Sequence, residues 1–408
     1  MSRRPRNREA EPARSAQAPV RVLYVQHADP AGYPPVVHSV AMLADAGAEI
    51  RMLGLNIFEG RLQMPVHDGV RVTLRKREQG RLRIKAAFAA FTAQAAGLAL
   101  AWRPDWVYAS DALAAPAARL ISLATRSRVI YHEHDTVVRD ETTSRFMRRI
   151  LDARNDVVRR AEVCVVPNED RAAYLASVTG RQGILTVWNT PSLREVTETP
   201  KMPTSGALRL AYHGSIVPAR VPMTVVDALA RLPDCVTFVV TGYETSGHLG
   251  YATALQQRAH AAGVGRRLTV RLEVPREELL ELARASDVGL SLMPNETRDL
   301  NERHMVGASN KPFEYLASGL PLLVSDLPDW RRTFVEPGFG LACNPASAAS
   351  IAERLRWYLH HPAERGSMGA AGRRQVIDAW HYERGFAPVL DRMRISAATP
   401  DVTRRRAS

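Results

Sequence analysis

The chain has 408 residues, of which 46% are apolar and 24% charged, and its formal net charge at pH 7 is +13. This length exceeds one ordinary core and predicts two domains, and the composition excludes a disordered or fibrous protein. The positive charge suits nucleic acid, an anionic membrane surface or a phosphorylated substrate, and does not choose among them. Three separated cysteines among apolar neighbours, Cys164, Cys235 and Cys343, predict buried thiols in a reducing cytoplasm rather than disulfides or metal ligands.

The first half of the chain predicts an α/β domain over residues 20–195. Residues 1–19 carry five arginines, two glutamates and three prolines, which indicates a disordered basic tail without a signal peptide. After it, short β-branched runs alternate with helical stripes, a pattern typical of parallel strands covered by helices. Strands are expected at Val20–Gln26, Glu49–Leu55, Trp106–Tyr108, Arg128–Tyr131 and Glu162–Val166.

A basic run within this half is followed directly by an apolar one. Arg71–Lys85 contains seven basic residues and one acidic residue, Glu78, and Ala86–Trp102 is almost wholly apolar. Seventeen residues that include Thr92 and Gln94 are short and weakly hydrophobic for a membrane span. We therefore expect a buried helix, with peripheral contact between the basic run and an anionic membrane.

The second half repeats the pattern after a linker. Thr190–Ala207 is rich in proline, threonine and serine and has no apolar periodicity. A second α/β domain is expected over 205–378, then a helix within 379–396 that packs back across the cleft, and a tail at 397–408. Two such halves predict a ligand in the cleft between them. Strands are expected at Leu208–Tyr212, Val236–Thr241, Leu268–Leu272, Val288–Leu292 and Leu322–Ser325.

One segment of the second half has residues suited to a nucleoside diphosphate. Ser309 and Asn310 are good N-cap types, and Pro312 suits a first helical turn, so a helix is expected to begin there. Its free N–H groups and Lys311 would suit a diphosphate, while Glu314 would accept hydrogen bonds from two adjacent ribose hydroxyls. On spacing alone, an ordinary capped helix with a solvated lysine and glutamate remains open. No Asp-x-Asp pair for a metal is present.

Several segments together resemble the retaining glycosyltransferase family 4 of the GT-B type. Asn310–Pro321 is similar to that family's donor-binding helix and the turn after it. Tyr212–Arg220 resembles its glycine loop, Val240–Gly242 its next glycine turn, and Val274–Leu279 the segment beside the nucleotide base. The resemblance spans about residues 205–385. It implies an α/β GT-B fold, in which two Rossmann-like parallel-sheet domains face each other across a cleft.

The resemblance also implies roles for individual residues on the donor side. Glu314 would bind ribose, and Arg220 and Lys311 would neutralise the diphosphate. The chain departs from the family at Val306, where many members carry a carboxylate that contacts the sugar, and at Ser215, where many carry arginine. The other donor-binding residues expected from these segments are Gly214, Ser215, Gly242, Val274 and Asn310.

The first half matches the family more loosely. Gly32, in the loop after the first strand, would let the backbone approach the diphosphate. Val129–Asp135 resembles the strand that ends in a histidine facing the transferred sugar, which favours His134 as the catalytic residue and His132 as second choice on the acceptor or sugar side. The alternative for each is a structural histidine. A metal held by this pair lacks an obvious third ligand, so no metal is expected.

Together these features predict transfer of a sugar from a nucleoside diphosphate sugar to a glycan or lipid-linked acceptor, such as a cell-surface glycan or glycolipid precursor. Retained anomeric configuration, no cofactor, no metal and a location in the cytoplasm, at the inner face of the plasma membrane, are expected. A sugar-nucleotide epimerase or phosphorylase of the same fold is the first alternative. A basic nucleic-acid-binding protein is the second; without a recognised nucleic-acid motif, we expect no nucleic-acid partner.

Overall fold

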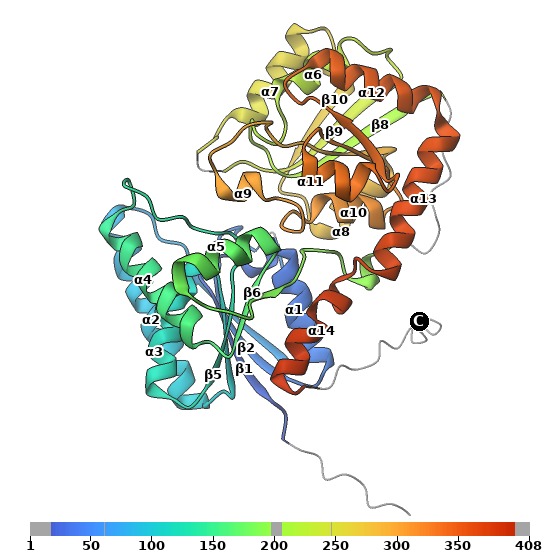
Figure 1. Cartoon of the computed structure of the whole chain (residues 1–408). Helices are drawn as coiled ribbons and strands as arrows, with labels where there is room; N and C mark the ends of the chain where they lie inside the picture. The colour runs from blue at the N-terminus through green and yellow to red at the C-terminus, as the bar shows by residue number, and fades with distance from the viewer. Residues whose placement is uncertain (1–17, 61, 197–205, 246, 396–408) are drawn as a thin grey trace, which may run out of the picture.

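The computed structural model of the chain describes residues 18–60, 62–196, 206–245 and 247–395. The predicted tails and much of the predicted linker lie outside these ranges. Within them the chain forms two lobes, each built on one parallel sheet, as Figure 1 shows. The predicted α/β class with two parallel-sheet domains is confirmed.

The N-terminal lobe contains a seven-stranded parallel sheet in the order β3-β2-β1-β4-β5-β6-β7. Its inner strand β1 is buried from Val22 to Val25, because helices cover both faces of the sheet. The strands are β1 Arg21–Gln26, β2 Glu49–Asn56, β3 Val70–Lys76, β4 Trp106–Ser110, β5 Arg128–His132, β6 Val163–Val166 and β7 Leu185–Thr186. The helices are η1 Pro30–Gly32, α1 Pro34–Asp45, α2 Arg81–Trp102, η2 Ala112–Ala114, α3 Ala115–Ala124, α4 Arg145–Arg160, α5 Glu169–Thr179 and η3 Leu193–Glu195.

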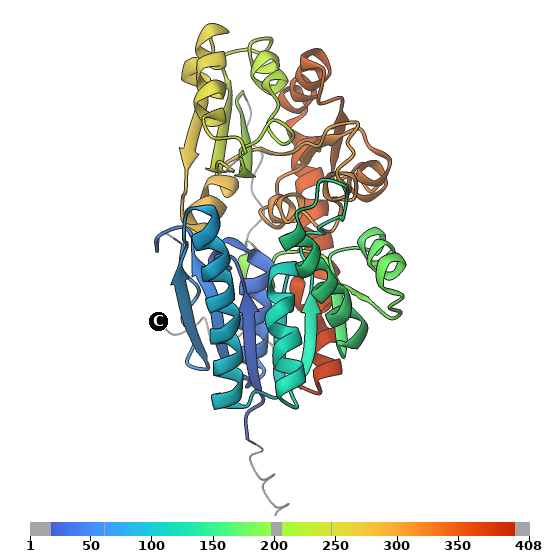
Figure 2. The same ribbon diagram turned by 90° about the vertical axis from the view of Figure 1, so that its left-hand side faces the viewer.

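The prediction of a buried helix over Ala86–Trp102 is wrong for about half of its surface. Helix α2 belongs to the outer layer of the lobe, and Figure 2 shows this layer facing the viewer. Phe91, Ala95 and Ala99 pack on the sheet, whereas Leu82 is 82% and Leu100 56% exposed. Small alanines cover the outward face, so composition did not reveal which face is buried. Within the described ranges α2 is also the one helix long and apolar enough to cross a membrane, by length and composition only.

The C-terminal lobe contains a six-stranded parallel sheet in the order β10-β9-β8-β11-β12-β13. The strands are β8 Leu208–Ser215, β9 Val236–Tyr243, β10 Leu268–Leu272, β11 Val288–Ser291, β12 Leu322–Ser325 and β13 Gly340–Cys343. The helices are α6 Met223–Leu229, α7 Tyr251–Ala261, η4 Gly265–Arg267, α8 Arg276–Arg284, α9 Leu300–Arg303, α10 Lys311–Ala317, α11 Pro328–Trp330, η5 Arg331–Val335, α12 Ala348–His360, α13 Pro362–Asp378 and α14 Tyr382–Met393.

The last helix returns to the first lobe. In Figure 1, α13 runs along the side of the second lobe and α14 lies beside α1. Tyr382, Phe386, Val389 and Leu390 are buried in the core of the N-terminal sheet, together with residues of β1, β4 and β5. The two lobes are therefore joined twice, once through the segment that contains η3 and once through the α13–α14 turn.

Candidate active site

A cavity lies between the two lobes, beyond the carboxyl ends of β1, β8 and β9, where parallel-sheet proteins usually hold their ligands. Most of the predicted donor residues line it: Gly32, Gly214, Ser215, Gly242, Val274, Asn310, Lys311 and Glu314. Arg220, His132 and His134 are not among the lining residues.

Two glycines bring the ends of β8 and β9 close to the cavity. Gly214 and Gly242 are register partners with φ of 121° and 155°, a backbone region that favours glycine. A Cβ atom on Gly242 would lie 1.7 Å from the carbonyl oxygen of Gly214. One on Gly214 would lie 2.5 Å from Cε of Lys311. The glycines thus allow the lysine to lie directly against bare backbone.

Glu314 is the most tightly held group of the cavity wall, with 1% of its surface exposed. Its Oε2 accepts a hydrogen bond from Nε2 of His213 at 2.6 Å. Its Oε1 accepts from Nη2 of Arg276 at 2.7 Å and from Nδ2 of Asn310 at 2.7 Å. The backbone N–H of His213 in turn donates to the Tyr315 hydroxyl, which fixes the imidazole beside the carboxylate.

These contacts determine the charge of Glu314. Burial alone would raise the pKa of this carboxyl, but Arg276 and His213 outweigh it and hold the pKa well below its usual range. Burial lowers the pKa of His213, so the imidazole is neutral near pH 7 and donates from Nε2. The cavity wall therefore holds an ionised carboxylate, which only accepts hydrogen bonds.

Lys311 is the first residue of α10 and lines the same cavity. Burial, and then the charge of Arg220, lower the pKa of its ammonium to about 8. Arg220 itself is half-buried, and its Nη1 contacts the sulfur of Met293. The predicted basic pair is thus close enough to interact, but only the lysine reaches the cavity.

The predicted helix start is confirmed, with Asn310 at the N-cap position and Pro312 in the first turn. Asn310 makes no side-chain capping bond, because its backbone angles are helical, and its amide nitrogen donates to Glu314. Helix α10 is also only seven residues long. We therefore assign most of the positive potential at this end of the cavity to Lys311 rather than to the helix.

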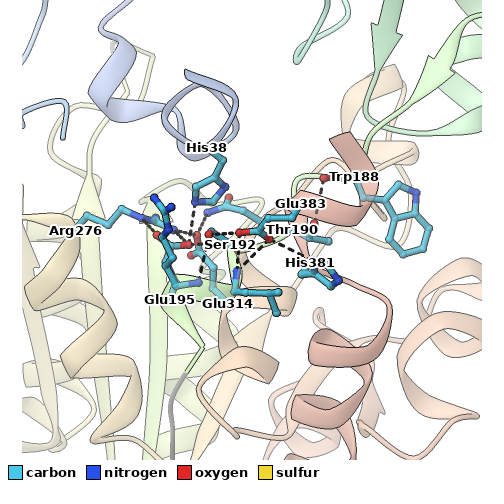
Figure 3. Close-up of polar contacts among 12 residues, drawn as sticks. His38, Trp188, Thr190, Ser192, Glu195, Arg276, Glu314, His381 and Glu383 are labelled. Carbon is cyan, nitrogen blue, oxygen red and sulfur yellow. Dashed lines mark hydrogen bonds and ion pairs between the residues drawn. The ribbon is translucent and has the colours of Figure 1, made fainter. Parts of the chain in front are cut away.

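The network is completed by Glu195, which lies in η3 within the segment that joins the two lobes and is called the hinge carboxylate below (Figure 3). The sequence did not single it out. Nε and Nη2 of Arg276 donate to Oε1 and Oε2 of Glu195 at 2.6 and 2.9 Å. Nε2 of His38, on α1, donates to Oε2 of the same glutamate at 2.9 Å. Glu195 also belongs to a capping box with Ser192. That Ser-x-x-Glu spacing was the available signal, but it lies inside the segment interpreted as a linker.

The two candidate histidines of the N-terminal lobe are buried behind the cavity wall. Nδ1 of His132 lies 2.6 Å from the Tyr108 hydroxyl, and the rings of His132 and His134 are 4.1 Å apart. Burial, and then Arg171, lower the pKa of His134 to about 3, so this imidazole is neutral. Within the described residues neither of its ring nitrogens has a hydrogen-bond partner. The catalytic role of His134 stays a prediction.

The loop at Val306, where the family's carboxylate is missing, is bound to the opposite lobe. Nδ2 of Asn168 donates to the carbonyls of His304 and Val306 at 3.0 and 2.8 Å. Nδ2 of Asn189 donates to the Ala308 carbonyl at 2.7 Å. These amides fix the loop from the first lobe, so its backbone position depends on how the lobes are arranged.

Within the described ranges one group of side chains has metal-ligand chemistry, and it lies outside the cavity wall. Asp170, His304 and Asp329 bring their ligand atoms within 4.8 Å of one another. Nδ1 of His304 is 3.1 Å from Oδ2 of Asp170, an ordinary ion-pair contact across the two lobes. The group carries no assignment here.

Comparison with known proteins identifies both lobes. The family model described as a glycosyl transferase 4-like domain matches residues 31–187, and the one described as glycosyl transferase-like matches residues 223–391. No curated protein sequence matches the chain.

Three solved structures illustrate the likeness of the fold. Sucrose-phosphate synthase from Thermosynechococcus elongatus is 14% identical with a TM-score of 0.68, covering 92% of this chain and 98% of that chain. Anabaena HepE in complex with UDP and glucose is 15% identical with a TM-score of 0.68, covering 92% and 99%. WaaG, a glycosyltransferase involved in lipopolysaccharide biosynthesis, is 12% identical with a TM-score of 0.65, covering 92% and 100%. At these identities the likeness shows the fold alone.

Proposed function

The chain belongs to glycosyltransferase family 4, the group 1 glycosyltransferases with the GT-B fold, and we propose that it transfers a sugar from a nucleoside diphosphate sugar to a glycan or lipid-linked acceptor. The observation that carries the proposal is Glu314, an ionised carboxylate in the wall of the cavity between the lobes. Such a group selects a ligand that donates hydrogen bonds, as the vicinal hydroxyls of a ribose do. Anabaena HepE, of the same fold, has been solved with UDP.

Lys311 supports the same proposal from the other end of the ligand. As the sugar separates from the donor, negative charge grows on the diphosphate. A buried cation already in place stabilises that charge without reorganising. Lys311 supplies it in the wall, and Arg220 adds positive potential close to Lys311. With cations in this position, we propose transfer without an obligatory metal. We propose retained anomeric configuration from the resemblance to family 4 alone.

A thermal-shift panel tests the donor. UDP, GDP, ADP and dTDP, free and as glucose conjugates, are added to the wild-type protein. We expect the nucleoside diphosphates of one base to raise the melting temperature of the protein, because a ligand that binds only the folded state stabilises that state. No shift with any of them would contradict the proposal. Conversion of the donor into a second sugar nucleotide without an acceptor would instead indicate an epimerase.

The stereochemical and metal proposals need separate measurements. Once an acceptor is found, the anomeric proton of the product reports its configuration by NMR. We expect it to match the donor, and an inverted product would overturn retention.

Turnover in excess EDTA should stay within about twofold of the untreated rate, since no metal step is required. Loss that Mg²⁺ or Mn²⁺ restores would overturn the metal-free proposal.

We further propose that the outer face of the N-terminal lobe contacts an anionic membrane, at the inner face of the plasma membrane. Strand β3 and the start of α2 expose the basic residues Arg71, Lys76, Arg77, Arg83 and Lys85. Between them lie exposed apolar side chains, with Leu82 82% and Ile84 47% exposed. Basic residues among exposed apolar ones favour anionic lipid headgroups over a neutral surface. A lipid-linked acceptor would suit this location.

Vesicle sedimentation tests this contact. Wild-type protein should bind vesicles with 30% phosphatidylglycerol at low salt. The variant Lys76→Glu/Arg77→Glu should bind at least about 30-fold more weakly, because each of the two lost basic residues contributes roughly 1 kcal/mol near the surface. Arg231→Glu/Arg266→Glu makes the same charge change on exposed residues of the other lobe and should bind like wild type. Equal binding by all three proteins, or none by wild type, would remove the proposal.

A further inference from the structure

The carboxylate of Glu314 has little capacity left for a ligand. An ionised carboxylate offers about four acceptor sites. Three of them are taken, by His213 on Oε2 and by Arg276 and Asn310 on Oε1. On the proposed function, the two adjacent hydroxyls of the donor's ribose both donate to this group. One of the three present donors therefore has to leave.

Arg276 is the donor that can leave at the lowest cost. His213 and Asn310 direct their side chains to Glu314 alone within the described part of the chain. Arg276 instead pairs with two carboxylates at once, and its fork with Glu195 uses both Nε and Nη2. A guanidinium that loses Glu314 would still keep a bidentate partner, which is the strongest arrangement available to it.

Glu195 is held in place as the counter-charge of the Arg276 guanidinium. Its side chain is 17% exposed, and His38 and Ser192 hold the carboxylate from the other side. Burial would raise its pKa, but His38 and then Arg276 hold the pKa at about 2, so the group is ionised at any working pH. Because His38 belongs to the N-terminal lobe, this partner of Arg276 is itself fixed to the opposite side of the cleft.

We propose that Arg276 is an internal occupant of the ribose site. The donor displaces it from Glu314 and leaves it paired with the hinge carboxylate Glu195 alone. This inference rests on the proposed function and adds a regulatory element to the same site. Donor binding then strengthens the His38–Glu195–Arg276 contact between the lobes, and by linkage that contact strengthens donor binding. Glu195 is a positioning residue here, since it acts on the donor only through Arg276.

The test compares a ribonucleotide with its 2′-deoxy form. UDP carries both hydroxyls and has to displace Arg276, whereas 2′-deoxy-UDP carries one and fits the single acceptor site that remains. We expect Glu195→Gln to weaken UDP binding about tenfold, the scale of one charge-assisted hydrogen bond, and to leave 2′-deoxy-UDP within about twofold. GDP and ADP with their 2′-deoxy forms replace this pair if the thermal-shift panel selects another base.

Two further variants separate displacement from direct binding. Arg276→Ala should bind UDP as well as wild type or better, and Glu195→Gln should have no further effect in that background. If Arg276→Ala loses UDP binding, the arginine is a direct ligand and the inference is wrong. If Glu195→Gln weakens UDP and 2′-deoxy-UDP equally, the glutamate has a structural role and the inference is also wrong.

The fold and the proposed function each have their own control. Glutamine keeps an acceptor for the capping box with Ser192, and melting temperature reports whether the variant is folded. If Glu195→Gln unfolds, Glu195→Asp keeps the charge while shortening its reach to Arg276, and a smaller selective loss for UDP is expected. Failure of UDP, GDP, ADP and dTDP alike to bind wild type overturns the proposed function, whereas equal effects of Glu195→Gln on the ribonucleotide and its 2′-deoxy form overturn this inference alone.

Discussion

The two walls of the cavity differ in chemistry. The N-terminal lobe contributes Ala31, Gly32, Pro34, Phe58 and Leu62, none of which is ionisable. The C-terminal lobe contributes His213, Glu273, Arg276, Lys311 and Glu314, which are charged or titratable. The C-terminal lobe thus provides the polar contacts, and the N-terminal lobe provides the shape of the cavity and covers it. On the proposed function, we expect the second lobe to determine donor binding and the first lobe to act mainly on the acceptor.

A substitution at Glu314 is the strongest test of this difference between the two walls. We expect Glu314→Gln to lower the rate of nucleoside diphosphate release from the donor about 10³-fold, because the ribose loses a charged acceptor. Glu277→Gln changes an exposed glutamate of α8 and is the matched control. A Glu314→Gln rate within threefold of that control, by coupled assay, would place the donor elsewhere.

Lys311 should have the next largest effect. Lys311→Met removes the buried cation while keeping an unbranched side chain against Gly214. The rate should fall about 10²-fold, the usual cost of losing one group that stabilises a leaving anion. Lys76→Met on β3 provides the control. Equal rates for the two variants would mean that the diphosphate is neutralised by other groups.

His134 tests the role of the N-terminal lobe. Its ring is neutral and buried, and in the described residues neither ring nitrogen has a hydrogen-bond partner, so a role in the chemistry requires the ring to become accessible when an acceptor binds. We expect His134→Ala to lower transfer about tenfold, a modest share of what general acid–base groups contribute, while nucleoside diphosphate affinity stays unchanged. A loss of diphosphate affinity instead would mean that His134 contributes to donor binding, and the two lobes would then not have separate roles.

The smallest expected effect is on pH dependence. A lysine is charged below its pKa, so Lys311, with a pKa of about 8, loses its charge as pH rises through that value. The diphosphate is fully ionised above pH 7, and its own charge stays constant there. Affinity for the diphosphate should fall about fivefold between pH 7 and pH 9.5, and Lys311→Arg should flatten the profile, since arginine stays charged. A flat wild-type profile by calorimetry would contradict this role of Lys311.

The sequence predicted which residues of the C-terminal lobe come together in the cavity wall, because many of them are close together in the chain. Asn310, Lys311 and Glu314 belong to one helical turn, and Gly214 and Gly242 follow adjacent strands, so local patterns place them at one sheet edge. The hinge network was missed because its contacts join distant positions: Arg276 is 81 residues from Glu195, and His38 is 157 residues from it. No local pattern encodes such pairs.

The outer layer of the first lobe shows a second limit. Residues 70–76 form the edge strand β3, although the basic run was interpreted only as a contact surface. Charged side chains suit edge strands, so charge concealed the strand. Alanines on both faces of α2 likewise gave no amphipathic signal from which its exposed side could be predicted.

The central claim is that Glu314 binds the ribose of a nucleoside diphosphate. Isothermal titration of wild type, Glu277→Gln and Glu314→Gln with the diphosphate selected by the thermal-shift panel tests it most directly. We predict equal affinity for the first two proteins and a loss of about 100-fold or more for Glu314→Gln, with all three folded. Undiminished binding by folded Glu314→Gln would contradict the claim.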